Sequence, residues 1–180
     1  MTWVGAPVAR TQDRRMLLGR GKFTGDLART GTLHAAFVRS PFAAATFGPI
    51  DTSPALARPG VAAAFTAADL GDPALLAMLE RPEFVPTPLP LLAIGQVRHV
   101  GEPVAVVLAE DPYLAEDAIE LVDVDWSPQP VVASMDAAIA PEAPQVHDHA
   151  PGNCLVDLTM FDDQKLEGVF AAAPAVVTAT

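Results

Sequence analysis

The chain has 180 residues, of which 51% are hydrophobic and only one is a cysteine. This length suffices for one compact core, and a single cysteine excludes both an intrachain disulfide and a cysteine-rich metal site. The net charge of −11 is uneven, because residues 1–98 carry ten of the eleven Lys/Arg residues while residues 99–180 carry most of the acidic ones. An acidic surface repels nucleic-acid phosphates and anionic lipids, so neither is an expected partner.

Residues 1–30 are basic and lack a clean helical or strand period, so we expect an extended arm with a short strand at residues 16–18. The pair Arg14-Arg15 is followed by Gly19-Arg20-Gly21 where a twin-arginine export signal requires an apolar run. These glycines also lack the strand, the helix and the third glycine of a phosphate-binding loop, which favours a turn or a close backbone approach. No run reaches the roughly 18 apolar residues of a membrane span, and we predict a cytoplasmic protein.

From residue 31 onward, the pattern predicts a mixed α+β domain. Apolar and β-branched runs predict strands at 31–40, 46–50 and 61–65, and Ser53-Pro54 and Asp72-Pro73 each start a helix, the second covering residues 74–79. Residues 80–90 contain four prolines, which predict a stiff, irregular excursion or, as the alternative, a polyproline ligand. His34 and His99 fall in expected strands, and we interpret both as core residues.

The most organised stretch runs from Arg98 to Trp126. Val104–Leu108 predicts a buried strand, and Asp111-Pro112 supplies a helix start. After the helix, apolar residues at 122, 124 and 126 alternate with aspartates, which predicts a second, half-buried strand. The expected apolar face of the helix consists of Leu114, Ala118, Leu121 and Val122. A strand–helix–strand unit therefore forms the predicted nucleus of the domain.

The last part of the chain predicts a short strand at 131–133, a brief helix from Ser134 to Ile139, a helix over about 162–173 and a strand at 176–178. His147 and His149 lie two residues apart in an irregular segment, but no third metal ligand is evident. Cys154 is expected to be a small buried apolar residue. No spacing indicates a triad, a metalloprotease motif or a perturbed carboxylate pair, so we predict no catalytic, cofactor-binding or metal-ligating residue in this chain.

Several blocks, in order, resemble the large molybdopterin-binding subunit of molybdenum hydroxylases, the xanthine dehydrogenase/aldehyde oxidase family. They are the Gly-Arg-Gly arm within 10–27, the Leu-His-Ala-Ala-x-Val-Arg-Ser-Pro run at 33–41, the Ile-Asp-Thr start at 50–61 and the Val-Gly-Glu-Pro stretch at 100–126. The sequence departs from the family pattern at Gln12, Leu18, Gly25, Phe42 and Ala44. The resemblance implies a hammerhead-type α+β domain over residues 31–140, preceded by the basic arm of 1–30. Residues 141–180 would be a linker and the start of the molybdopterin-binding domain.

The resemblance also implies a function. Family members hold molybdenum on a pterin dithiolene, use a glutamate far toward the C-terminus as general base, and pass electrons through 2Fe-2S clusters to FAD or another acceptor. We expect this chain to be the scaffold and interface part of such an oligomeric oxidoreductase acting on a heteroaromatic, aldehyde or similar substrate, inactive by itself. Its expected partners are the rest of the large subunit and the iron-sulfur and flavin subunits or domains. The alternative is a stand-alone, non-catalytic binding or assembly domain, which a stop codon after residue 180 would favour.

Overall fold

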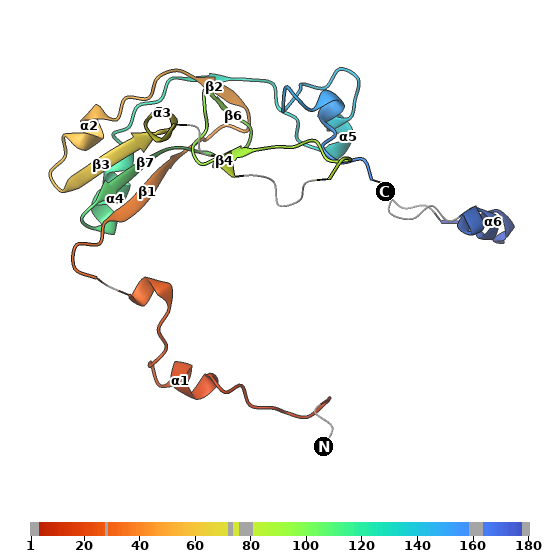
Figure 1. Cartoon of the computed structure of the whole chain (residues 1–180), viewed down its shortest axis with the longest axis horizontal. Coiled ribbons are helices and arrows are strands. Elements are labelled where there is room, and N and C mark those ends of the chain that lie inside the picture. Colours follow the sequence, from red (N-terminus) through yellow and green to blue (C-terminus); the bar gives the residue numbers. More distant parts are fainter. Residues whose placement is uncertain (1–3, 28, 72–73, 76–80, 159–163, 178–180) are drawn as a thin grey trace.

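The computed structural model describes residues 4–27, 29–71, 74–75, 81–158 and 164–177. The middle of the chain forms a body of small antiparallel sheets and short helices (Figure 1). The N-terminal arm leads away from this body, and the last helix lies apart from it at the other end. The α+β class expected from the sequence is confirmed.

The strands of the described residues are β1 (His34–Arg39), β2 (Ala45–Phe47), β3 (Val61–Thr66), β4 (Ala74–Leu75), β5 (Leu89–Pro90), β6 (Gln96–Val97), β7 (Pro103–Ala109) and β8 (Trp126–Pro128). The helices are α1 (Asp13–Leu17), α2 (Ser53–Leu56), α3 (Ala67–Leu70), α4 (Pro112–Ile119), α5 (Met135–Ala138) and α6 (Gln164–Ala172), with 3-10 turns η1 (Thr24–Asp26) and η2 (Pro151–Asn153). None of these helices has the length and hydropathy that a bilayer crossing requires.

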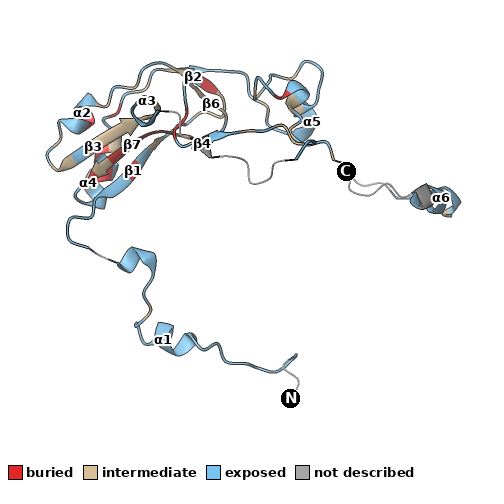
Figure 2. Ribbon diagram, viewed as in Figure 1, coloured by how far each residue is buried: buried red, intermediate tan, exposed pale blue. Residues whose placement is uncertain are grey.

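The first sheet has the order β1-β7-β3, with both pairings antiparallel. The central strand β7 places Val107 opposite Ala36 of β1 and Ala64 of β3. Helix α4 packs on one face of this sheet, where Val107 and Ala109 are fully buried (Figure 2). The apolar run that predicted a buried strand therefore forms the centre of the domain.

Strand β7 turns into α4 as the sequence predicts. The Asp111 side chain accepts the backbone N–H of Leu114 at 2.9 Å, and Pro112 stands at the first helical position. Ala115 and Ala118 face the sheet, and the small size of these residues lets the helix approach the strands closely. Leu121 was expected on the buried face but is 39% exposed, because α4 ends at Ile119 and the chain turns there.

The second sheet has the order β6-β2-β8 and is also antiparallel. Its core combines Ala45, Val97 and Val104 with a partly buried aromatic group. In this group the Trp126 ring lies 5.4 Å from the ring of Phe47 and 5.9 Å from that of Phe42, measured between centroids. These tilted contacts join the start of β8 to β2.

The strand expected at 122–126 is only partly formed. Val122 is buried, Val124 and Trp126 are half-buried and the intervening aspartates are exposed, so the predicted alternation is correct. Regular pairing is limited to a bridge between Asp51 and Asp123, and β8 begins only at Trp126. Moreover, β7 and β8 belong to different sheets, so the strand–helix–strand unit links two sheets rather than forming one.

Four local predictions of secondary structure are wrong. Residues 16–18 were expected as a strand, but Met16 and Leu17 belong to helix α1, whose first turn carries Asp13 at the favourable end of the helix dipole. Residues 74–75 were expected in a helix but pair with β5, because tertiary pairing overrides local propensity; residues 76–80 lie outside the described part. No strand forms at 131–133 or at the described residues 176–177.

The proline-rich excursion is held to a later part of the chain. The backbone N–H of Val85 donates to the Leu155 carbonyl at 2.9 Å, and Phe84 forms a bridge with Val156. Apart from β5, the described residues 81–90 contain no regular element. These contacts favour the stiff excursion over a free polyproline ligand.

Candidate functional site

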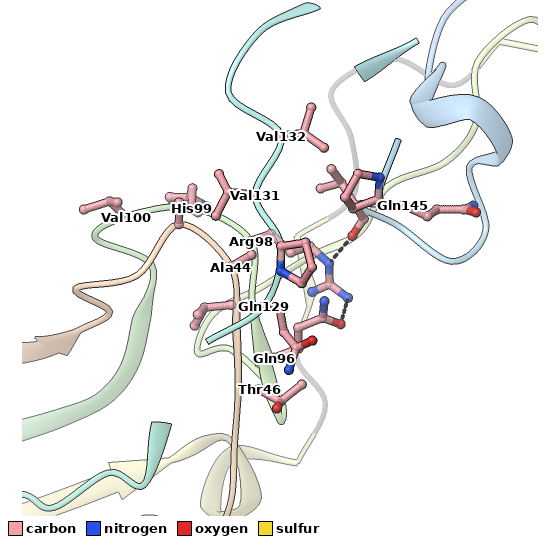
Figure 3. Close-up of a pocket in the computed structure, with 15 residues that line it drawn as sticks. Ala44, Thr46, Gln96, Arg98, His99, Val100, Gln129, Val131, Val132 and Gln145 are labelled. Atoms are coloured by element: carbon pink, nitrogen blue, oxygen red, sulfur yellow. Dashed lines mark hydrogen bonds between the residues drawn. The ribbon is translucent and has the colours of Figure 1, made fainter. Parts of the chain in front are cut away.

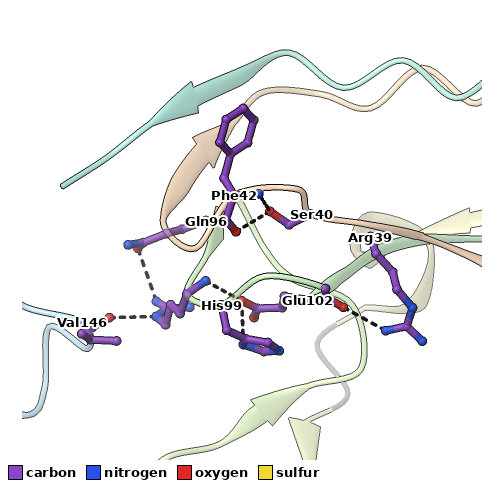
Figure 4. Close-up of polar contacts among 9 residues, drawn as sticks. Arg39, Ser40, Phe42, Gln96, His99, Glu102 and Val146 are labelled. Carbon is purple, nitrogen blue, oxygen red and sulfur yellow. Dashed lines mark hydrogen bonds and ion pairs between the residues drawn. The ribbon is translucent and has the colours of Figure 1, made fainter. Parts of the chain in front are cut away.

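The tight turn between β6 and β7 is hydrogen-bonded to the residue that follows β1. The backbone N–H of Ser40, directly after β1, donates to the Glu102 carbonyl at 2.9 Å, and the Gly101 N–H donates to the Ser40 carbonyl at 2.8 Å. Gly101 has a φ of +84°, which favours glycine at this point of the turn. The guanidinium of Arg39 donates to the Gly101 carbonyl at 2.9 Å (Figure 4). The Arg-Ser-Pro and Gly-Glu-Pro blocks of the sequence thus meet in one junction.

The Glu102 side chain closes this turn from inside. Glu102 is only 8% exposed, and its Oε2 accepts the backbone N–H of Arg98 at 2.5 Å. The same oxygen lies 3.4 Å from Nδ1 of His99. A buried carboxylate needs such partners, because burial without them is costly. The Glu102 carboxylate therefore stabilises the turn and does not point into a cavity.

Arg98 extends the junction to the later loop. Its Nε donates to the Val146 carbonyl at 3.0 Å and its Nη2 lies 3.4 Å from Oε1 of Gln96 (Figure 4). Asn153 fixes the same loop from its other end: its Oδ1 accepts the Val146 N–H at 2.8 Å and its Nδ2 donates to the Ala138 and Pro144 carbonyls. Together, Arg98 and Asn153 hold the irregular segment that follows α5.

A pocket of about 420 Å³ lies beside this junction (Figure 3). Its walls come from the start of β2, the 96–100 turn, the segment after β8 and the 144–146 loop. The polar side chains among the lining residues are Thr46, Gln96, Arg98, His99, Gln129 and Gln145. This set can donate and accept hydrogen bonds, and its His99 pairs through Nδ1 with the buried Glu102, but the lining contains no serine or cysteine nucleophile and no carboxylate.

The rings of His147 and His149 lie against each other in a tilted arrangement, with centroids 5.5 Å apart and planes 54° apart. Burial lowers the pKa of His147 below its usual value, and the positive charges of Arg98 and His149 act in the same direction. Within the described residues, no three His, Cys, Asp or Glu side chains converge as metal ligands. The pair therefore has the environment of a packing contact rather than of a metal site among the described residues.

Three side chains that were predicted to be buried are exposed. His34 belongs to β1 but is exposed, and His99 lies outside β6 and is also exposed. Cys154 was expected to be buried but is exposed, at the position directly after η2. Core assignment from a strand pattern fails for these residues because each stands at an edge or an end.

The glycines of the arm behave as predicted. Gly19 has a φ of +66° directly after α1, and a Cβ at Gly21 would lie 2.5 Å from Sδ of Met16. One glycine thus permits a turn and the other a close approach. Sequence reasoning missed Glu102 and Asn153 as structural centres. For Asn153 the sequence carries a signal, because the preceding Pro151-Gly152 pair marks a turn and asparagine tolerates the positive φ that is found there.

The comparisons with known proteins now identify the family. A sequence model described as "Aldehyde oxidase and xanthine dehydrogenase, a/b hammerhead domain" matches residues 18–130. The chain belongs to this family. The resemblance to molybdenum hydroxylase large subunits and the hammerhead fold are both confirmed.

Relatives and solved structures extend the match. The nicotine 6-hydroxylase large subunit of Paenarthrobacter nicotinovorans is 44% identical over 124 residues, which are 68% of this chain and 15% of that protein. The carbon monoxide dehydrogenase large chain of Hydrogenophaga pseudoflava is 32% identical over 179 residues, 93% of this chain and 22% of that one. Quinoline 2-oxidoreductase from Pseudomonas putida 86 is 38% identical, with a TM-score of 0.84 over 94% of this chain and 22% of its own. The hammerhead chain thus spans about a fifth of the length of these proteins.

The donor set does not fit the pterin-held molybdenum that the family implies. The Arg98 guanidinium already bonds to Val146 and contacts Gln96, and no buried side-chain nitrogen or oxygen in the described part lacks a hydrogen-bond partner. The described residues therefore show no orphaned buried polar group that a bound cofactor would satisfy.

Proposed function

We propose that this chain is the N-terminal scaffold and interface part of the molybdopterin-binding subunit of a molybdenum hydroxylase. The complete enzyme would hydroxylate a heteroaromatic, aldehyde or similar substrate with oxygen from water. The observation that supports this most directly is the likeness to quinoline 2-oxidoreductase, which extends over 94% of this chain but only 22% of that one. A pocket whose lining contains no serine, cysteine or carboxylate side chain fits a supporting role for this hammerhead domain.

The chemistry would then belong to other parts of the subunit. We propose that no residue of this chain is catalytic, holds the cofactor or ligates a metal, and that the molybdopterin site is formed by polypeptide beyond it. The boundaries at residues 30 and 140 also remain part of the proposal. Iron-sulfur and flavin partners are proposed as electron carriers; the names of two relatives, a "dehydrogenase complex subunit gamma" and a "large subunit", support partner subunits in general.

The arm should bind to neighbouring parts of the enzyme. Its side chains are exposed, including Leu17 and Phe23, although isolated apolar side chains favour burial. Its Arg and Lys residues could meet acidic surfaces. Limited trypsin digestion tests this: cleavage at Arg14 to Lys22 should be fast in the 180-residue chain and slow in the assembled enzyme. Equal cleavage in both would contradict the interface role.

Metal analysis of two samples tests the division of labour. The 180-residue chain should carry no stoichiometric molybdenum and oxidise neither quinoline-type heteroaromatics nor aldehydes. The complete product of the reading frame, expressed with its neighbouring subunits, should carry molybdenum and be active. Molybdenum in the isolated chain would refute the division, and a stop codon after residue 180 would favour the stand-alone assembly domain. A cytoplasmic location stays a prediction, which cell fractionation can check.

A further inference from the structure

The β1-β7-β3 sheet has two apolar faces, but the part of the chain that the structure describes covers only one of them. Helix α4 packs on the face that carries Ala36 and Val107. The strand registers place a second set of side chains on the opposite face, in two rows across the three strands. This set, which we call the open face, consists of Ala35, Phe37, Ala63, Phe65, Val106 and Leu108.

The open face is apolar and incompletely buried. Phe37 is 40% exposed, Ala35 is exposed, and the other four side chains are half-buried. None of the six belongs to the buried clusters of the described residues. Figure 1 shows the arm leading away from this sheet and α6 lying apart from it, so neither segment supplies a cover.

One charged group borders the open face. The Arg39 guanidinium lies over the Phe37 ring, with Cζ 5.3 Å from the centroid, and is fixed by its bond to the Gly101 carbonyl. An aromatic and aliphatic centre with an ordered arginine at its edge is the composition of a protein interface core. Burying such a face contributes on the order of 25 cal/mol for each Å² removed from water.

We propose that the open face is the docking surface for the remainder of the same large subunit. This inference rests on the proposed function. The relatives carry about four-fifths of their length outside the matched region, which supplies ample polypeptide for the cover. A domain linked through a short flexible segment also acts at an effective concentration in the millimolar range.

Cysteine labelling tests this assignment. Ala35→Cys is introduced into a Cys154→Ser background, both in the 180-residue chain and in the complete subunit, and maleimide labelling rates are compared. We expect labelling at position 35 to slow at least tenfold in the complete subunit. The control is Tyr113→Cys on α4, where the native side chain is 82% exposed and lies away from the open face; it should be labelled at similar rates in both.

A charge at the open face provides the second measurement. Phe37→Lys should leave the circular dichroism of the 180-residue chain unchanged but lower the melting temperature or yield of the complete subunit, while Tyr113→Lys should change neither. Equal labelling at position 35 in both proteins, with wild-type complete subunit carrying molybdenum, would refute the docking surface and leave the proposed function intact. A complete subunit without molybdenum would instead contradict the proposed function. Dimerisation of the 180-residue chain that Phe37→Lys abolishes would overturn the assignment in favour of a second copy.

Discussion

The Glu102 carboxylate lies 3.4 Å from Nδ1 of His99 through the same oxygen that accepts the Arg98 backbone N–H. Glu102→Ala should leave that N–H without its acceptor inside the turn and lower the free energy of unfolding by about 1–3 kcal/mol. Glu102→Gln retains an acceptor oxygen and should cost less than half as much. Urea unfolding of the 180-residue chain measures both. Equal losses for the two variants would show that charge, not hydrogen bonding, holds the turn.

Gly60 joins α2 to β3 with a φ of +88°, and a Cβ there would lie 2.5 Å from Cδ2 of Leu114. The Leu114 methyl can move aside, so the backbone conformation dominates the cost. We expect Gly60→Ala to destabilise the fold by about 1–2 kcal/mol. The matched control is Gly48→Ala, since Gly48 has no positive φ and open space at its Cβ; its effect should stay within about 0.5 kcal/mol. Identical effects at both glycines would contradict this explanation.

Sequence reasoning succeeded where a signal is local. The buried strand before Asp111, the cap at that residue and the Ser134 cap of α5 all depend on neighbours within a few positions, and the structure confirms each of them. It failed where long-range pairing decides. Residues 74–75 are strand because β5 lies beside them, and Trp126 starts a strand of the second sheet because β2 supplies its partner.

The junction around Glu102 also depends on long-range contacts that the local sequence does not predict. The side-chain partners of Glu102, Arg98 and His99, are close in the sequence, but the turn that holds them is fixed through backbone hydrogen bonds to Ser40, which is 62 positions earlier in the chain. The pocket next to it combines segments from β2, the 96–100 turn, and the loops after β8 and α5. The family resemblance supplied the order of these blocks, but their meeting point required the fold. Burial of a charged residue is thus a product of topology.

His147 makes stability depend on pH. Burial, with the charge of Arg98, lowers the pKa of His147 in the folded chain, so the unfolded chain binds a proton first as the pH falls. Stability should therefore be full above the unfolded pKa of about 6.5 and decrease as the pH falls toward the lower folded value. His147→Gln should reduce this decrease. The difference between the urea midpoints at pH 7.5 and 5.5 measures this loss of stability. If that difference is the same in His147→Gln as in the native chain, His147 is not the source of the pH dependence.

Val106 and Val107 are adjacent in β7 and point to opposite faces of the sheet, which makes them a matched pair. Val107 is fully buried under α4, so Val107→Ala should cost the 180-residue chain about 2 kcal/mol from two lost methyl groups and the cavity they leave. Val106 lies half-buried on the open face, and Val106→Ala should cost less than 1 kcal/mol there. In the complete subunit the cost at Val106 should rise toward that at Val107, because the open face would then be covered. Urea unfolding of the chain and thermal unfolding of the complete subunit measure the two changes. Equal costs at Val106 and Val107 in the isolated chain would show that the face is already packed and would remove the structural reason for a docking partner.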